Sequence, residues 1–262
     1  MKPLFWRNKT IVITGTSSGI GEALLNILQT VPCKIFAIDR SPKQHPNLQA
    51  EVVPLLCDLS KEEDVIRTAN QILSQTNAID VLFNNAGITA HGRFDQTEIS
   101  VFKKTFDINF FGTVHLSRLL VEAIKQAKGT FFVTSTVSGL YGIPGRSAYS
   151  SSKAALHAVF ESIRIELSEF GVRSIIFCPP YTKTALRTSG LDAKGEKLNE
   201  AQAKGKIKTP EEVANEMIKA CENPNSRLVT MDKSGHFVKW MRLFAPALLE
   251  KILFKKLYED FH

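Results

Sequence analysis

The feature that most constrains the fold is a repeated alternation of short apolar runs with longer amphipathic segments. Runs rich in β-branched and aromatic residues predict seven strands, at 10–14, 34–38, 52–56, 79–83, 130–134, 173–178 and 227–231. Helical spacing predicts helices between them, at 19–30, 61–76, 99–127, 147–170 and 210–222. This alternation predicts an α/β fold, a doubly wound parallel sheet of about seven strands with helices on both faces. The carboxyl ends of its strands then share one edge, where ligands bind.

Composition supports one globular domain over residues 1–262, because no internal repeat or Pro/Gly-rich linker divides the chain. Apolar residues make up 44% and charged residues 23%, which excludes a disordered or fibrous chain. The net charge of +7 is spread along the chain, so we expect no nucleic acid as a partner. The four cysteines form no CxxC pair, so we expect neither a zinc site nor a disulfide scaffold.

The amino-terminal segment and the lengths of the apolar runs bear on location. Arg7 and Lys9 interrupt the first apolar stretch, so we expect no signal peptide. The sequence contains no run of about 20 apolar residues, so we expect no membrane-spanning helix. The expected location is the cytoplasm, with association at a membrane surface left open.

Local signals predict three helix ends. Ser60 with Glu63 three residues later predicts a capping box at the start of a helix. Gly171 stands where a helix carboxyl-terminal cap is expected, and Thr209 before Pro210 predicts an amino-terminal cap.

The first predicted strand runs straight into a glycine-rich turn, TGTSSGIG at 14–21. Gly15 lets the chain turn sharply, Gly19 allows backbone to approach a diphosphate, and Gly21 lets the next helix pack close to the sheet. The start of that helix offers free N–H groups to phosphates. The other cofactor-binding candidates in the turn are Thr16, Ser17, Ser18 and Ile20.

Acidic residues end the second and third predicted strands. Asp39 can accept hydrogen bonds from the adenosine ribose and would repel a 2′-phosphate, so NAD is favoured over NADP. Arg40 could instead pair with that phosphate, or the two residues could form a solvent-facing pair in a turn. Asp58, followed by Leu59, could meet the adenine ring or cap a turn.

Tyr149 and Lys153 have the spacing that places two side chains on one helix face. An ammonium group there favours the phenolate and lowers the pKa of the phenol. A phenol tuned in this way can exchange a proton with a carbonyl oxygen. Taken alone, the spacing is also common in structural helices.

These motifs occur in one order with Asn84-Asn85-Ala86-Gly87, Asn109 and Pro179-Pro180-Tyr181-Thr182-Lys183-Thr184. Over about residues 8–232 the chain thus resembles the short-chain dehydrogenase/reductase family, which has a Rossmann-type fold. The resemblance implies that Tyr149 is the catalytic acid/base and that Lys153 holds the nicotinamide ribose and lowers the Tyr149 pKa. Asn109 would anchor a water in a proton relay. Asn84, Asn85, Ala86 and Gly87 would lie beside the cofactor, with Pro179, Thr182 and Thr184 also on its binding side.

Two positions depart from the family pattern. Thr136 stands where the family usually has a serine, so we expect Thr136 to bind the substrate oxygen, with Ser138 as the alternative. Pro180 replaces the usual glycine and stiffens the wall beside the nicotinamide.

The resemblance implies an oxidoreductase that interconverts an alcohol with a ketone or aldehyde, and a non-enzymatic dinucleotide sensor is the alternative. Residues 181–208 would be a substrate lid. Aromatic residues around the site indicate a small, apolar substrate. The candidate contacts are Ser138, Tyr141, His91 and Tyr181. For His91, a solvated position in a loop is the alternative. His157 is expected at the surface or an interface.

The residues from 236 to 262 extend beyond the family core, and Pro246 is expected to divide them into two helices. Their apolar stripes predict that they cover something. They could pack beside the lid and wall an apolar pocket, or pair with a sister subunit in a homodimer or homotetramer. Aromatic residues with flanking lysines also suit a membrane surface.

Overall fold

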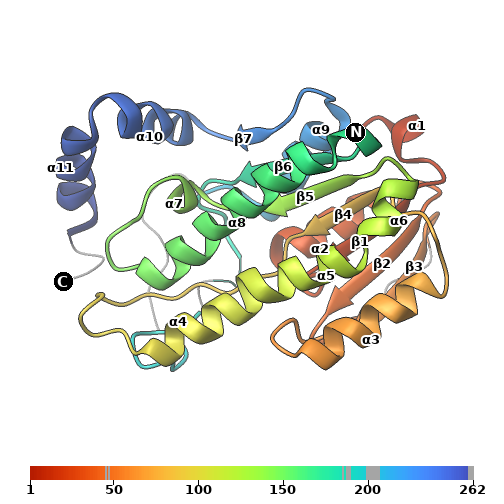
Figure 1. Cartoon of the computed structure of the whole chain (residues 1–262), viewed down its shortest axis with the longest axis horizontal. Coiled ribbons are helices and arrows are strands. Elements are labelled where there is room, and N and C mark those ends of the chain that lie inside the picture. Colours follow the sequence, from red (N-terminus) through yellow and green to blue (C-terminus); the bar gives the residue numbers. More distant parts are fainter. Residues whose placement is uncertain (45, 47, 185, 187–189, 199–206, 259–262) are drawn as a thin grey trace.

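The computed structural model describes residues 1–44, 46, 48–184, 186, 190–198 and 207–258. Its centre is a seven-stranded parallel sheet in the order β3-β2-β1-β4-β5-β6-β7 (Figure 1). This confirms the predicted Rossmann-type fold. The strands are β1 Thr10–Thr14, β2 Lys34–Asp39, β3 Glu51–Leu56, β4 Val81–Asn84, β5 Thr130–Thr134, β6 Arg173–Cys178 and β7 Leu228–Thr230. The strand order reverses between β1 and β4, which opens a crevice at their carboxyl ends.

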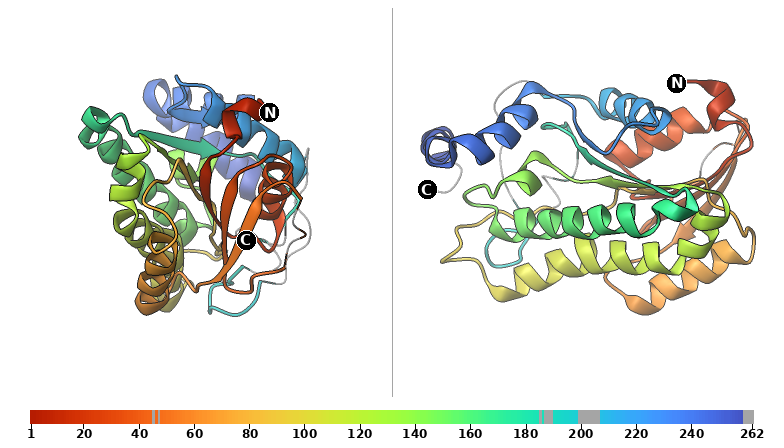
Figure 2. Two further views of the ribbon diagram at one scale, coloured as in Figure 1. Left: turned by 90° about the vertical axis from the view of Figure 1, so that its right-hand side faces the viewer. Right: turned by 45° about the horizontal axis from the view of Figure 1, so that its top comes forward.

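Helices cover both faces of the sheet (Figure 2). One face carries α2 (Gly19–Leu28) and α9 (Pro210–Glu222), and the other carries α3 (Glu62–Leu73), α4 (Ile99–Phe106), α5 (Thr113–Leu119), α6 (Val121–Gln126) and α8 (Ser147–Glu166). Strand side chains alternate between the two cores: Val12 packs in the α3–α5–α8 core, whereas Ile11 and Ile13 pack in the α2–α9 core with Trp6. Both faces of the central strands are therefore buried, as parallel sheets require.

The long predicted helix at 99–127 is divided. A π-helical segment, Asp107–Gly112, joins α4 to α5. Gly112 packs closely against the loop between β3 and α3. A Cβ at this position would stand 2.3 Å from the carbonyl oxygen of Leu59. The wider π turn holds Asn109 fully buried, and such segments are frequent at functional sites.

Two of the three predicted helix ends are confirmed. Thr209 caps α9 in a capping box with Glu212, and Gly171 ends a short 3₁₀ turn with a left-handed φ of 71°. The capping box at Ser60 is wrong, because α3 begins after Lys61 and the Ser60 hydroxyl donates to the Asp58 carboxylate at 2.7 Å. Two short helices were not predicted, α1 (Pro3–Trp6) and α7 (Val137–Leu140).

The carboxyl-terminal extension forms α10 (Lys233–Phe244) and α11 (Pro246–Leu257), divided at Pro246 as expected. The two helices lie beyond the carboxyl ends of the strands, next to α7 (Figure 1). Arg242 Nη1 donates to the Leu140 carbonyl oxygen at 2.6 Å, and Tyr141 donates to the Glu250 carboxylate at 2.9 Å. None of the described helices is both long enough and apolar enough to cross a membrane.

Fewer apolar side chains of the extension are buried than its sequence pattern predicts. Val238 and Leu249 are buried against the core. In contrast, Trp240 is 60% exposed and Phe244 74% exposed, and their rings stack at 5.4 Å. Further exposed apolar side chains are Phe237, Leu243, Leu248, Ile252, Phe254 and Tyr258. The single chain therefore leaves an outward apolar surface, which we call the tail surface.

Candidate active site

The glycine-rich turn between β1 and α2 is shaped for close approach of a ligand. Gly15 and Gly19 have φ of 78° and 58°, which L side chains rarely adopt. A Cβ at Gly21 would stand 2.0 Å from the Gly15 carbonyl oxygen, so no side chain fits there. Thr184 lies directly against Gly19, since a Cβ at Gly19 would be 2.9 Å from its Cγ2. The turn and Thr184 thus form one closely packed cradle at the start of α2, where helix N–H groups are available to a diphosphate.

Asp39 ends β2 beside this cradle. Its carboxylate accepts hydrogen bonds from the backbone N–H of Ser17 and of Ser41, both at 3.0 Å. Each carboxylate oxygen has a further lone pair, so ribose hydroxyls can still donate to it. Arg40 is exposed. The Asp39 carboxylate therefore lies at the glycine turn.

Asp58 takes part in a turn, and Leu59 packs in the core. Asp58 accepts from the Ser60 backbone N–H at 3.0 Å and from its hydroxyl, which is the turn alternative left open by the sequence. Leu59 is buried in the core that includes α3 and α5. The Asp58 carboxylate remains half-buried at the sheet edge.

The end of β4 is tied to the end of β1. Thr14 Oγ1 accepts from the backbone N–H of Asn85 and of Ala86, both at 3.0 Å. The Asn85 side chain donates to the Thr14 carbonyl oxygen and accepts from Thr134. Asn84 points the other way, into the core, where it donates to Ser117 at 3.0 Å. Asn85, Ala86 and Gly87 thus form the edge, and Asn84 supports it from behind.

Asn109 and Lys153 meet at Gly87. A Cβ on Gly87 would stand 2.9 Å from Asn109 Oδ1 and 3.3 Å from Lys153 Nζ. Asn109 Oδ1 accepts from the Ile88 N–H at 2.8 Å, and its amide donates to the Ile88 carbonyl and to Ser152. Lys153 Nζ donates to the Thr134 carbonyl at 2.9 Å. Two predicted catalytic residues are therefore held at one point of the sheet edge.

Tyr149 lies one turn before Lys153 on α8, and both are buried. Burial raises the pKa of Tyr149 to about 12, and the nearby Arg146 guanidinium acts in the opposite direction. Burial lowers the pKa of Lys153 to about 8. In the chain alone the pKa of Tyr149 is thus raised rather than lowered, because desolvation of the phenol outweighs the neighbouring positive charge.

Thr136 and Ser138 are both beside the site, at the start of α7. Thr136 Oγ1 accepts from the Ser138 N–H at 3.3 Å, and the two hydroxyls lie 3.4 Å apart. Ser138 is buried and Thr136 is half-buried. The two hydroxyl candidates therefore form one polar pair.

The two ends of the expected lid are fastened together. Lys183 N–H donates to the Lys208 carbonyl, and Lys208 N–H donates to the Tyr181 carbonyl, both at 2.9 Å. Thr182 Oγ1 donates to the Pro180 carbonyl at 2.9 Å. Pro179 is half-buried at the start of this segment and Tyr181 is exposed. Of the predicted lid, residues 185, 187–189 and 199–206 lie outside the described part.

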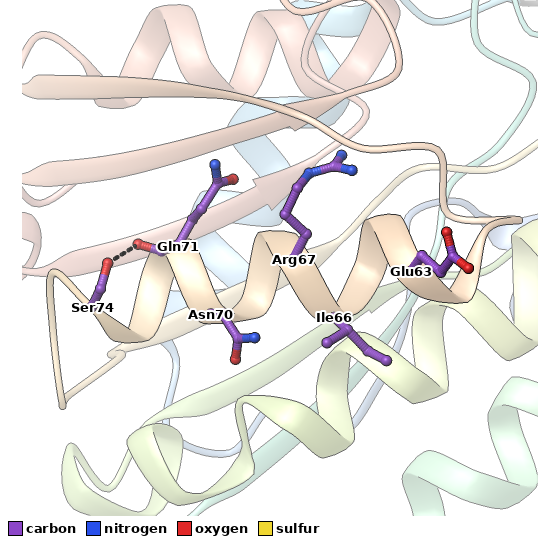
Figure 3. Close-up of a pocket in the computed structure, with 6 residues that line it drawn as sticks. All are labelled: Glu63, Ile66, Arg67, Asn70, Gln71 and Ser74. Carbon is purple, nitrogen blue, oxygen red and sulfur yellow. Dashed lines mark hydrogen bonds between the residues drawn. The ribbon is translucent and has the colours of Figure 1, made fainter.

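An apolar groove separates the α7–α8 loop from α11. Tyr141, Gly142 and Pro144 line one side, and Leu253 and Phe254 line the other, with a volume of about 540 Å³. Glu250 and Lys251 also border it. A second hollow, on the outer surface of α3, contains none of the predicted site residues (Figure 3). Of these two hollows, the groove contains one predicted site residue, Tyr141.

The histidines differ from their surface expectations. His91 is only 7% exposed, so the solvated-loop alternative is wrong. His157 is buried one turn beyond Lys153, and its Nε2 is hydrogen-bonded to the Ser135 hydroxyl at 2.7 Å. Burial lowers the pKa of His157 to about 4. Its spacing of four from Lys153 was a signal that it shares the inward face of α8.

Comparison with known proteins identifies the family. The model of the short chain dehydrogenase family matches residues 9–194. Dehydrogenase/reductase SDR family member 7B of Xenopus tropicalis is 31% identical over 261 residues, which span 93% of this chain and 84% of that protein. Dehydrogenase/reductase SDR family protein 7-like of Drosophila melanogaster is 28% identical over 265 residues, 95% of this chain and 80% of that protein.

Solved structures share the fold. A short chain dehydrogenase from Burkholderia cenocepacia J2315, in complex with NADP, has a TM-score of 0.80 at 22% identity and covers 95% of this chain and 98% of its own. A short chain dehydrogenase/reductase from Burkholderia phymatum, in complex with NAD, has a TM-score of 0.78 at 22% identity, covering 93% and 96%. The family match and the 31% identical relative agree with the motifs and with this fold. The chain belongs to the short-chain dehydrogenase family.

Proposed function

We propose that the protein is an NAD(P)-dependent oxidoreductase that interconverts a secondary alcohol and a ketone, or a primary alcohol and an aldehyde. The observation that carries this proposal is the meeting of Lys153 and Asn109 at Gly87, with Tyr149 one turn away on α8. A non-enzymatic dinucleotide sensor has no need for an acid/base group at that point. The glycine cradle alone would suffice for it.

The cofactor would be held along the edge from α2 to α8. The N–H groups at the start of α2, in the cradle of Gly15, Gly19 and Gly21, would hold the diphosphate, and Asp39 would accept the adenosine ribose hydroxyls. Lys153 would donate to the nicotinamide ribose. When bound, the nicotinamide supplies or accepts the hydride. The charge of Asp39 favours NAD, because a 2′-phosphate would lie against a carboxylate held at Ser17.

Tyr149 would move the proton. In reduction its hydroxyl donates to the substrate oxygen as negative charge develops there, and in oxidation the phenolate accepts that proton back. Thr136 and Ser138 would supply hydroxyl donors to the same oxygen. Lys153 and Arg146 would stabilise the phenolate, whose formation burial otherwise opposes.

The tail surface supports a further part of the proposal, contact with a membrane. Exposed Trp240, Phe244 and Leu248 lie among Lys239, Lys251 and Lys255, a composition that suits the boundary between lipid headgroups and acyl chains. The groove between Tyr141 and α11 is lined in part by Leu253 and Phe254 of the same carboxyl-terminal extension and would take an apolar substrate. A membrane-resting enzyme could draw such a substrate from the lipid.

Tyr149→Phe tests the catalytic proposal. We expect NAD binding, followed by fluorescence titration, to stay within about threefold of the wild type, because only the phenolic oxygen is removed. Turnover across a panel of alcohols and ketones should fall by about 10² or more. Tyr258→Phe is the matched control, since Tyr258 is exposed at the end of the tail. Unchanged turnover in Tyr149→Phe, or a tighter titration with NADP than with NAD, contradicts the corresponding part of the proposal.

A further inference from the structure

Arg146 was not singled out by the sequence, yet it lies in the site. It directly precedes α8, so its side chain is one turn before Tyr149. Its backbone is anchored: Arg146 and Gly92 form a parallel bridge, and the Gly92 N–H donates to the Gly145 carbonyl at 2.8 Å. The Ser150 N–H also donates to the Arg146 carbonyl at 2.8 Å. The guanidinium is therefore carried by a fixed piece of backbone.

The guanidinium contains an unused donor. Arg146 Nη2 is fully buried and has no hydrogen-bond partner among the described residues. Other arginines use their terminal donors: Arg67 pairs with Asp64, and Arg242 donates to the Leu140 carbonyl. A buried donor without a partner costs free energy and calls for an explanation, such as a group that binds there.

Tyr181 orients this guanidinium. The Arg146 Cζ lies 5.5 Å from the centre of the Tyr181 ring. Such an interaction engages the face of the guanidinium, whereas its N–H donors point outward in its plane. Tyr181 thus borders the guanidinium on one side, and Nη2 remains available to donate to a planar or tetrahedral oxyanion.

The same guanidinium is close to the reacting hydroxyl. Its positive charge lowers the pKa of Tyr149 against the larger effect of burial. An oxyanion paired with Arg146 would therefore lie beside the substrate oxygen that Tyr149 serves. The loop from Tyr141 to Pro144, just before Arg146, borders the apolar groove.

We propose that Arg146 determines substrate specificity by binding an anionic group, a carboxylate or a phosphate, on the molecule whose carbonyl or alcohol reacts at Tyr149. This rests on the proposed oxidoreductase function. The substrate would then combine an apolar portion in the groove with one oxyanion near the reacting carbon. Arg146 Nη2 donates its N–H groups in the fixed plane of the guanidinium, a geometry that a lysine ammonium does not reproduce.

Matched charged and neutral substrates test the proposal. The probes are a medium-chain 3-oxo acid with its methyl ester, and a 2-oxoalkyl phosphonate with its dimethyl ester. The readout is the ratio of kcat/KM for the charged form to that for its ester, because any effect of Arg146 on Tyr149 itself cancels. We expect Arg146→Gln to lower this ratio by about 10- to 100-fold and Arg146→Lys to restore only part of it. The pair with the larger loss identifies carboxylate or phosphate.

Arg93→Gln is the matched control. Arg93 lies on the adjoining loop and already pairs with Asp95, so removing its charge tests general attraction of anions. We expect its ratio to stay within about twofold of the wild type. Equal losses on acid and ester in Arg146→Gln, or an equal fall in ratio in Arg93→Gln, overturn the proposal.

A binding measurement separates this proposal from the catalytic one. With NAD present, octanoate should raise the Tm of the wild type by about 2–5 °C, and methyl octanoate should raise it less. The difference should vanish in Arg146→Gln, whose own Tm and NAD binding show that it is folded. This outcome can hold even if Tyr149→Phe reveals no catalytic role. No octanoate shift in the wild type, or the same shift in Arg146→Gln, contradicts the anion site.

Discussion

At the scale of single residues, the hydroxyls of Thr136 and Ser138 are the two candidates to bind the substrate oxygen. We expect Thr136→Ala to lower kcat by about 10²–10³, the usual effect of removing one donor to a developing oxyanion. Ser138→Ala should have a much smaller effect. Thr136→Ser, which keeps the hydroxyl that accepts from the Ser138 N–H, should restore most of the activity. Steady-state kinetics decides, and a larger loss in Ser138→Ala would assign the role to Ser138 instead.

His157 makes stability depend on pH. Its pKa lies near 4 in the folded chain, below the ordinary value of 6.5, so the unfolded chain binds a proton first as the pH falls. The free energy of unfolding should therefore decrease from about pH 6.5 to pH 4, by roughly 3 kcal/mol at most. His157→Gln keeps an acceptor for Ser135 without this titration. Urea unfolding at several pH values should give the variant a flatter profile, and an equally steep one would contradict this origin.

Parts of the site fixed by residues close together in the sequence could be predicted, whereas parts that depend on distant residues could not. The glycine turn and the Tyr149–Lys153 pair could be predicted, because strand-to-turn continuity and helical spacing fix them locally. Arg146 could not, since its orientation depends on Tyr181, which follows β6. The direction of the Tyr149 pKa change was also missed, because burial by the whole fold outweighs one neighbouring charge.

At the scale of elements, the π-helical segment depends on Gly112. We expect Gly112→Ala to destabilise the fold by about 1–3 kcal/mol, because its Cβ would meet the rigid Leu59 carbonyl rather than a movable side chain. Since that segment holds Asn109, activity should fall as well. Gly142→Ala is the control, with open space around its Cβ. Denaturant unfolding checks this, and equal stability of the two variants would show that the segment adapts.

Strands and helices were predicted better than their interruptions. Apolar periodicity indicated every strand and the positions of α2, α3, α8 and α9. The division of 99–127 escaped it, because the π segment follows from packing of Gly112 against Leu59, a residue distant in the sequence. The Ser60 capping box failed because α3 begins one residue later than predicted, after Lys61, while the Ser60 hydroxyl donates to the Asp58 carboxylate.

At the scale of the whole molecule, the tail surface should direct membrane association. We expect Trp240→Ser with Phe244→Ser to reduce binding to vesicles that contain anionic lipid by at least about tenfold, because two large exposed apolar side chains are lost. Ile165→Ser is the control, since Ile165 is 76% exposed on α8, away from the tail. Vesicle sedimentation measures the effect. Undiminished binding, or a loss of oligomers in its place, would assign the surface to another role.

The fastening of Tyr181 and Lys183 to Lys208 has a consequence for how such an enzyme can diversify. Backbone hydrogen bonds join the two ends of this segment, and they involve none of the residues between those ends. Because the entropy of closing a loop rises only by about 0.6 kcal/mol for each doubling of length, the intervening stretch can be lengthened, shortened or exchanged at little thermodynamic expense. The sheet, the glycine turn and α8 would be inherited unchanged. Such a module can be grafted between relatives, with a new substrate range on an old catalytic frame.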